Sequence, residues 1–289
     1  MLHDGEVWRV ALDTHEACEN YGCFEVAYDK IPTQSRAETF SAIRQLFDLP
    51  LYTKQKNVNL YPALGYCGQI AAIPLYESLG IEDASNFESL KSFTGLIQAV
   101  ISILKSLEEL NHIIVRAILD GYGLGEKTES IISCKTLLRV MRYRAPPAGE
   151  YMKGLQPHTD KIWTTILCED EVSGLEVETK DGKWVKLSPS PGSFIFMVLD
   201  CLMAWYNCRM HVVKHRRYIP VNAICIRSTV VVFAFPSKII LAVVFFGFLF
   251  FALFKGFSGG KQCGFDLSEF FQPYPCLRSS VSMVNSRLP

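Results

Sequence analysis

The spacing of apolar residues divides the chain into two halves with different periods. Up to about Gly125, apolar residues recur every three or four positions, which is typical of amphipathic helices. This pattern predicts a first helix around residues 8–17, a second that ends at Leu49-Pro50, and a long one over about 86–119. Glycines at 121, 123 and 125 end the long helix, and residues 21–26 predict a short strand between the first two.

From about Thr136 onward the pattern changes to short apolar or alternating segments that Gly and Pro separate. The Asp181-Gly182 pair predicts a tight hairpin turn. The segments expected to form strands are 137–143, 164–167, 174–179, 183–187, 194–199, 219–226 and 229–235. We therefore predict an α+β protein with a helical N-terminal region (1–130) and a double-stranded β-helix, or jelly-roll, core (131–238).

An uncharged apolar run, residues 239–254, stands between Lys238 and Lys255 and opens an atypical tail that extends to residue 289. As a helix this run would rise about 24 Å, which is short of the roughly 30 Å hydrocarbon core of a bilayer. A divergent tail without a selected structure is favoured over a packed core helix, and a membrane anchor is the least favoured of the three.

The composition mainly argues against certain partners and kinds of site. The 289 residues carry equal numbers of basic and acidic side chains, which offers no general attraction for nucleic acid or an anionic membrane. The ten cysteines include no Cys-x-x-Cys pair, and the first residues lack the apolar core of a secretory signal. We expect a cytoplasmic monomer that binds a small molecule.

Three residues form a candidate metal site. His158 and Asp160 are two positions apart, so in an extended chain their side chains point to the same face. His215 follows on a later strand, and a jelly roll would return that strand beside the first. Each residue alone is better explained as a surface turn or a core histidine. Together, two imidazoles and one carboxylate match the triad that binds Fe(II) with three open positions, whereas structural zinc would need a fourth ligand.

A candidate anion-binding residue follows the triad. Arg227 opens the apolar strand expected at 229–235, where a charge needs a partner, and Thr229 shares its face. A guanidinium pairs with a carboxylate through two parallel hydrogen bonds, so this pair could bind the free carboxylate of 2-oxoglutarate. The alternative is an ordinary surface arginine.

Longer motifs carry a resemblance to a known family. The motifs are 156–161 (QPHTDK), 174–194 (GLEVETKDGKWVKLSPSPGSF) and 200–216 (DCLMAWYNCRMHVVKHR). Shorter ones are YGCFEV, LFDLP, TKQK and PLYESLGI in the first hundred residues. Residues 8–236 resemble the plant 2-oxoglutarate-dependent dioxygenases, nearest the group that modifies glucosinolate side chains.

The resemblance assigns roles to particular positions. It makes His158, Asp160 and His215 the iron ligands. Arg227 and Thr229 fall on the Arg-x-Ser pair that holds the co-substrate, and Tyr143 falls on a tyrosine that reaches it. His211 matches a position that is not a ligand.

The same resemblance implies a chemistry. It implies an oxidoreductase that uses Fe(II), 2-oxoglutarate and O₂, with ascorbate as an accessory cofactor, to hydroxylate or desaturate a small specialised metabolite. The protein's part in such chemistry is to place the substrate beside the metal and exclude water.

Some positions depart from the family pattern. Cys208 stands where the family has a turn glycine, and Leu199-Asp200 replaces Gly-Asp before an expected strand at Ala204-Trp205. The segment between His215 and Arg227 is longer than the family spacing. These departures motivate an alternative, a catalytically impaired, truncated dioxygenase-like protein that binds metal at most.

Overall fold

The computed structural model describes residues 14–58, 65–68, 70–71, 73–82, 96–127, 135–144, 154–170, 174–217 and 227–235, the last segment by its backbone alone. Several predicted features lie outside these residues. They are the start of the first helix, residues 86–95 of the long helix, the strand at 219–226, the apolar run at 239–254 and the rest of the tail.

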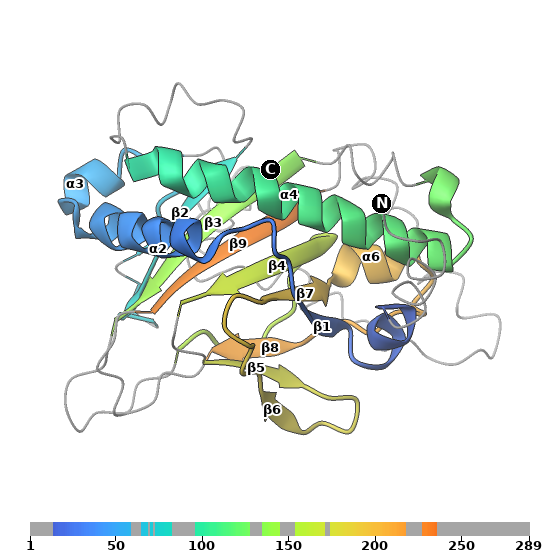
Figure 1. Cartoon of the computed structure of the whole chain (residues 1–289). Helices are drawn as coiled ribbons and strands as arrows, with labels where there is room; N and C mark the ends of the chain where they lie inside the picture. The colour runs from blue at the N-terminus through green and yellow to red at the C-terminus, as the bar shows by residue number, and fades with distance from the viewer. Residues whose placement is uncertain are drawn as a thin grey trace, which may run out of the picture.

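The described strands form two antiparallel sheets (Figure 1). The larger sheet has the order β1 (Cys23–Val26), β7 (Phe194–Val198), β4 (Thr164–Glu169), β9 (Arg227–Phe235), β3 (Lys135–Tyr143) and β2 (Tyr76–Glu82). The smaller sheet has the order β6 (Trp184–Lys186), β5 (Leu175–Glu178) and β8 (His215–Arg217). Strands β1 and β2, from the N-terminal part of the chain, therefore lie at the two edges of the larger sheet.

Helices α2 (Thr33–Asp48) and α4 (Leu96–Gly121) run across one face of the larger sheet (Figure 1). Each buries an apolar stripe, represented by Ile43 on α2 and Leu107 on α4. Helix α2 ends at the predicted Leu49-Pro50 boundary, and α4 ends at the first of the three predicted glycines. Shorter elements are α3 (Leu51–Lys54), the 3₁₀ turn η4 (Gly125–Lys127) and α6 (Asp200–Trp205).

The strand alternation explains the layers of the molecule. On β3, Leu138 and Val140 pack in the cluster beneath the helices, whereas Leu137, Met141 and Tyr143 belong to a second cluster with residues of the smaller sheet. The larger sheet is thus covered on both faces. This double burial accounts for the uninterrupted burial of β4 and β7, since neither strand has a solvated side.

Most predicted elements are confirmed, including the hairpin of β5 and β6, in which Gly182 takes φ of 78°. The strand expected at Ala204-Trp205 is wrong, because these residues end helix α6. The sequence of α6 has no β-branched residue, and its Cys201, Leu202 and Met203 are buried on a helical turn.

Strand β2 was not among the elements that the sequence predicted. It pairs with β3 along its whole length. Its alternation is concealed because Glu77 is buried like its apolar neighbours, held by Lys54 at 2.5 Å and by Arg142 at 3.2 Å. Only the tertiary ion pairs make that position compatible with a buried strand.

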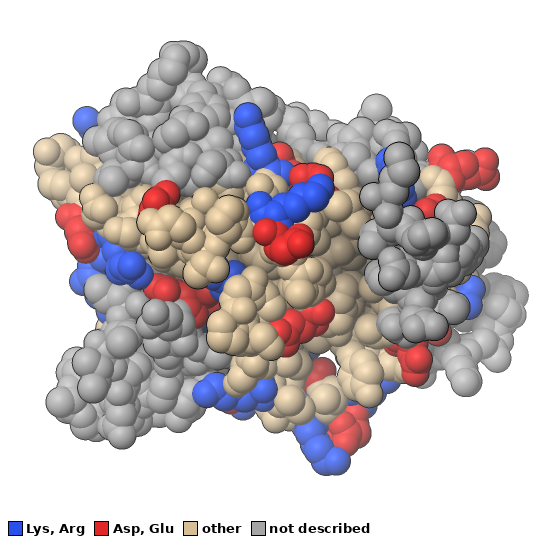
Figure 2. All heavy atoms as spheres, viewed as in Figure 1, with Lys and Arg blue, Asp and Glu red and all other residues tan. Residues whose placement is uncertain are grey.

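The visible surface agrees with the balanced composition. On the face shown in Figure 2, acidic and basic side chains are interspersed rather than gathered into one patch of either sign.

Candidate metal centre

The two sheets meet at a pair of histidines. His158 and His215 form an isolated antiparallel bridge, in which the N–H of His158 donates to the carbonyl of His215 at 3.0 Å and the reverse bond is 2.9 Å. Their rings lie with centroids 4.3 Å apart. The backbone bridge therefore places on one face two imidazoles that are distant in sequence.

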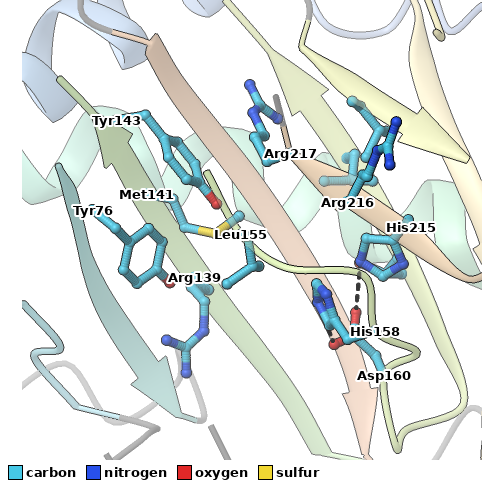
Figure 3. Close-up of a pocket in the computed structure, with 13 residues that line it drawn as sticks. Tyr76, Arg139, Met141, Tyr143, Leu155, His158, Asp160, His215, Arg216 and Arg217 are labelled. Atoms are coloured by element: carbon cyan, nitrogen blue, oxygen red, sulfur yellow. Dashed lines mark ion pairs between the residues drawn. The ribbon is translucent and has the colours of Figure 1, made fainter. Parts of the chain in front are cut away.

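Asp160 completes a cluster of three. Its Oδ1 lies 3.7 Å from Nε2 of His158, and its Oδ2 lies 3.6 Å from Nε2 of His215 (Figure 3). One ligand atom from each residue lies within 4.8 Å of the others, and this is the one such group found among the described residues. The structure thus brings together the three residues that the sequence singled out.

Both rings make a hydrogen bond through Nδ1 to a backbone carbonyl. Nδ1 of His158 donates to the carbonyl of Gln156 at 2.7 Å, and Nδ1 of His215 donates to that of Val213 at 3.2 Å. A carbonyl can only accept, so each Nδ1 carries a proton, and each Nε2 is the ring nitrogen close to Asp160. Burial, with the neighbouring His158, lowers the pKa of His215 to about 4, so this imidazole is neutral at physiological pH.

Asp200 supports the loop that carries Asp160. Its backbone N–H donates to the carbonyl of Asp160 at 3.2 Å, and its carboxylate accepts from the Thr159 hydroxyl at 2.8 Å and from Lys161. Burial raises the pKa of Asp200, although the Lys161 hydrogen bond opposes that shift. The neighbours on both sides of Asp160 are thereby held from one point at the start of α6.

A pocket opens beside the cluster, between the two sheets (Figure 3). Apolar side chains such as Leu155, Leu167 and Leu175 form part of its lining. The polar residues of the lining, apart from the three of the cluster, are Tyr76, Arg139, Tyr143, Thr165, Arg216 and Arg217. Asp160 is the sole acid among these lining residues, so the pocket favours an anionic ligand.

The structure describes the side chain of Tyr143, but only the backbone of the other two predicted co-substrate residues. Tyr143 is buried and lines the pocket, and burial raises its pKa. The register of β3 and β9 places Arg227 opposite Tyr143 and Thr229 opposite Met141, on the sheet face that bears the pocket. The side chains of Arg227 and Thr229 lie outside the described part of the chain.

Three arginines of the lining were missed by sequence reasoning, and one of them, Arg216, pairs with Glu176 at 2.6 Å. Arg139 donates to the Ser78 hydroxyl at 2.9 Å, and Arg217 pairs with Glu169. The signal for Arg217 was present, because it stands two residues after His215 and so shares its strand face. His211 is separate from the three-residue cluster, and its backbone N–H bonds to Cys18 at 2.9 Å.

The donor set fits a non-haem iron. Two imidazole nitrogens and one carboxylate on one face leave open positions for a chelating co-substrate and O₂, which is the pattern of the facial triad. Backbone carbonyls orient both rings, as they do in many metal-binding histidines.

Comparison with protein families agrees with this geometry. The model of the 2OG-Fe(II) oxygenase superfamily matches residues 135–236. The model described as non-haem dioxygenase in morphine synthesis N-terminal matches residues 3–74. The chain belongs to the 2-oxoglutarate- and Fe(II)-dependent oxygenases, and within them it groups with plant enzymes.

Individual relatives support that placement. The chain is 38% identical over 225 residues to "Probable 2-oxoglutarate-dependent dioxygenase AOP1" of Arabidopsis thaliana, covering 72% of this chain and 68% of the relative. It is 35% identical over 208 residues to 2-oxoglutarate-dependent dioxygenase DAO of Oryza sativa subsp. indica, covering 70% and 69%. The resemblance inferred from the motifs is confirmed, and the dioxygenase is favoured over the impaired alternative.

A solved structure extends the likeness to the fold. Dioxygenase for auxin oxidation 1 from Arabidopsis thaliana, in its complex with 2-oxoglutarate, superimposes with a TM-score of 0.73 at 26% identity. The match covers 80% of this chain and 90% of that one. The protein is accordingly an oxidoreductase that uses Fe(II) and 2-oxoglutarate.

Among the helices in the described part of the chain, none combines the length and the apolar character needed to cross a bilayer.

Proposed function

We propose that His158, Asp160 and His215 hold Fe(II), and that the protein hydroxylates or desaturates a small specialised metabolite. The observation that carries the proposal is the convergence of two Nε2 atoms and one carboxylate within 4.8 Å at the edge of a pocket. Fe(II) bound there would couple the oxidation of substrate by O₂ to the decarboxylation of 2-oxoglutarate, which yields succinate and CO₂.

The residues around the metal have defined tasks. The Gln156 and Val213 carbonyls hold the two rings in the tautomer that coordinates, while Asp200 fixes the loop of Asp160. The apolar walls contributed by Leu155, Leu167 and other residues keep water from the reacting centre.

At the other end of the pocket, Arg227, Thr229 and Tyr143 are proposed to bind the second carboxylate of 2-oxoglutarate. The β3–β9 register supports this, because it sets Arg227 opposite the buried Tyr143. A guanidinium in an apolar surrounding binds a carboxylate more strongly than it would in water.

We also propose a domain organisation and a cellular setting for the whole chain. The two facing antiparallel sheets support a double-stranded β-helix core over 131–238, with an N-terminal region over 1–130 and an atypical segment over 239–289. A cytoplasmic monomer without nucleic-acid partners accords with the balanced charge of the sequence.

The test is the binding of 2-oxoglutarate to the Fe(II)-loaded full chain without oxygen, followed by the weak visible charge-transfer band of the chelate. We expect the band in the unmodified protein, its loss in His215→Ala and its weakening in Arg227→Ala. His211→Asn is the matched control, since this nearby histidine is not in the cluster, and its band should persist. Bound iron without a band in the unmodified protein would contradict the proposal.

A further inference from the structure

A buried cation lies on the pocket wall close to the metal centre. Arg217 is two residues beyond His215 on β8, and both are buried, whereas Arg216 between them is partly exposed. This alternation puts the Arg217 and His215 side chains on one face of the strand. Figure 3 shows Arg217 and Tyr143 above the group of His158, Asp160 and His215.

The hydrogen-bonding capacity of Arg217 is only partly used. Its Nη1 donates to Oε1 of Glu169, the last residue of β4. Its Nε and Nη2 are buried and have no partner among the described residues, and the same holds for Oε2 of Glu169. A guanidinium has five N–H donors in a planar fork, so Arg217 can bind a second carboxylate without releasing the first.

The position of Arg217 matches the far end of a metal-bound dicarboxylate. Its guanidinium carbon lies 5.1 Å from the ring centroid of Tyr143. Two residues along a strand rise about 7 Å, a span that a five-carbon dicarboxylate can bridge when its keto-acid end lies on the metal held by His215. The second carboxylate would then lie beside both Tyr143 and Arg217.

We propose that Arg217 binds the second carboxylate of 2-oxoglutarate while it stays paired with Glu169, and that the negative charge of Glu169 opposes this binding. Glu169 holds Arg217 in place, neutralises it in the free protein and limits how tightly the co-substrate binds. This inference rests on the proposed function, because it requires the keto-acid end to be at the metal.

The negative charge of Glu169 explains why this residue opposes the binding of a second carboxylate. Glu169 is opposite Thr229 in the β4–β9 register, so a carboxylate bound near the Arg227 and Thr229 positions approaches a buried acid of the same sign. In a pocket of low polarity this repulsion weakens binding, and the free donors of Arg217 offset it. Removal of the Glu169 charge should leave the attraction between Arg217 and the bound carboxylate and abolish the repulsion by Glu169.

The test is calorimetric titration of 2-oxoglutarate into the full chain loaded with Mn(II), which binds at iron sites but does not turn over. Glu169→Gln keeps an oxygen for Arg217 but loses the charge, and we expect about tenfold tighter binding. In the double variant Glu169→Gln/Arg217→Gln the buried pair is neutral, so the fold is retained, and we expect binding about tenfold weaker than in the unmodified protein.

Two controls separate this effect from general changes in the protein. 2-Oxobutanoate keeps the keto-acid end but lacks the second carboxylate, so its affinity should be the same in Glu169→Gln as in the unmodified protein. Glu77→Gln removes another buried, paired carboxylate on the larger sheet and should leave 2-oxoglutarate affinity unchanged.

The outcomes distinguish this inference from the proposed function. If the unmodified protein binds no 2-oxoglutarate, both fail. If it binds but Glu169→Gln has the same affinity, or tightens 2-oxobutanoate equally, Arg217 and Glu169 have only a structural role and this inference alone is overturned.

Discussion

Asp200 illustrates how single residues outside the metal cluster determine its geometry. It contacts Thr159, Asp160 and Lys161 but is not one of the three residues of the cluster. Because such supporting residues orient the ligands, Asp200→Asn should weaken Mn(II) affinity by roughly tenfold or more in a metal titration. The exposed hairpin residue Asp181, which pairs with Lys183, provides the control, and Asp181→Asn should bind metal normally. Equal affinities in the two variants would contradict the role of Asp200.

Cys208 is a second case at the residue scale. It adopts φ of 61°, next to Asn207 at 55°, in the left-handed region that favours the glycine of the family. The left-handed conformation costs a residue with a side chain roughly 1–2 kcal/mol relative to glycine. Cys208→Gly should therefore raise the free energy of unfolding by about 1 kcal/mol in denaturant titration, while Cys208→Ala, which keeps the Cβ, should give no such gain.

At the scale of elements, the contact of α2 and α3 with β2 and β3 depends on one buried acid. Glu77 on β2 accepts hydrogen bonds from Lys54 on α3, from Arg142 on β3 and from Arg144, which directly follows β3. Burial alone would raise the pKa of Glu77, but the Lys54 hydrogen bond and the Arg142 charge outweigh it, so the pKa is lowered.

This lowered pKa predicts an acid sensitivity. A carboxylate with a lower pKa in the folded state stabilises the protein above its unfolded pKa of about 4.5, and that stability is lost as the pH falls through the folded value. The free energy of unfolding should hence decline below about pH 4.5. Glu77→Gln should be less stable at neutral pH and show a shallower decline, whereas an unchanged slope would assign the acid sensitivity to other groups.

At the scale of the whole molecule, the candidate metal centre joins the two sheets. His215 lies on the smaller sheet, and its bridge to His158 connects that sheet to the segment leading into β4 of the larger one. A ligand that binds only the folded state stabilises it by about 2.7 kcal/mol when present at one hundred times its dissociation constant.

Metal and co-substrate should consequently raise the melting temperature together. We expect Mn(II) with 2-oxoglutarate to stabilise the unmodified protein in thermal scans, and a chelator to reverse the shift. The variant His215→Ala should show no shift, because it lacks one of the three proposed ligands. Full stabilisation of that variant would place the metal elsewhere.

Much of this molecule follows from local patterns in the sequence. Helical spacing predicted α2 and the described part of α4, Asp181-Gly182 predicted the hairpin, and His-x-Asp with a later histidine marked the three residues that converge. These inferences succeed because periodicity and turn chemistry depend on neighbours in the chain.

Other features depend on partners that are distant in sequence. Strand β2 and the Arg217–Glu169 pair became visible only in the folded chain, because an acid or a base is tolerated in the interior only where the fold supplies its counter-charge. Helix α6 was likewise mistaken for a strand, since the burial of Leu202 and its neighbours is set by what packs over them. The sequence by itself determined which residues could bind the metal, whereas the tertiary structure decided which charges surround them, because those charges meet only across the two sheets.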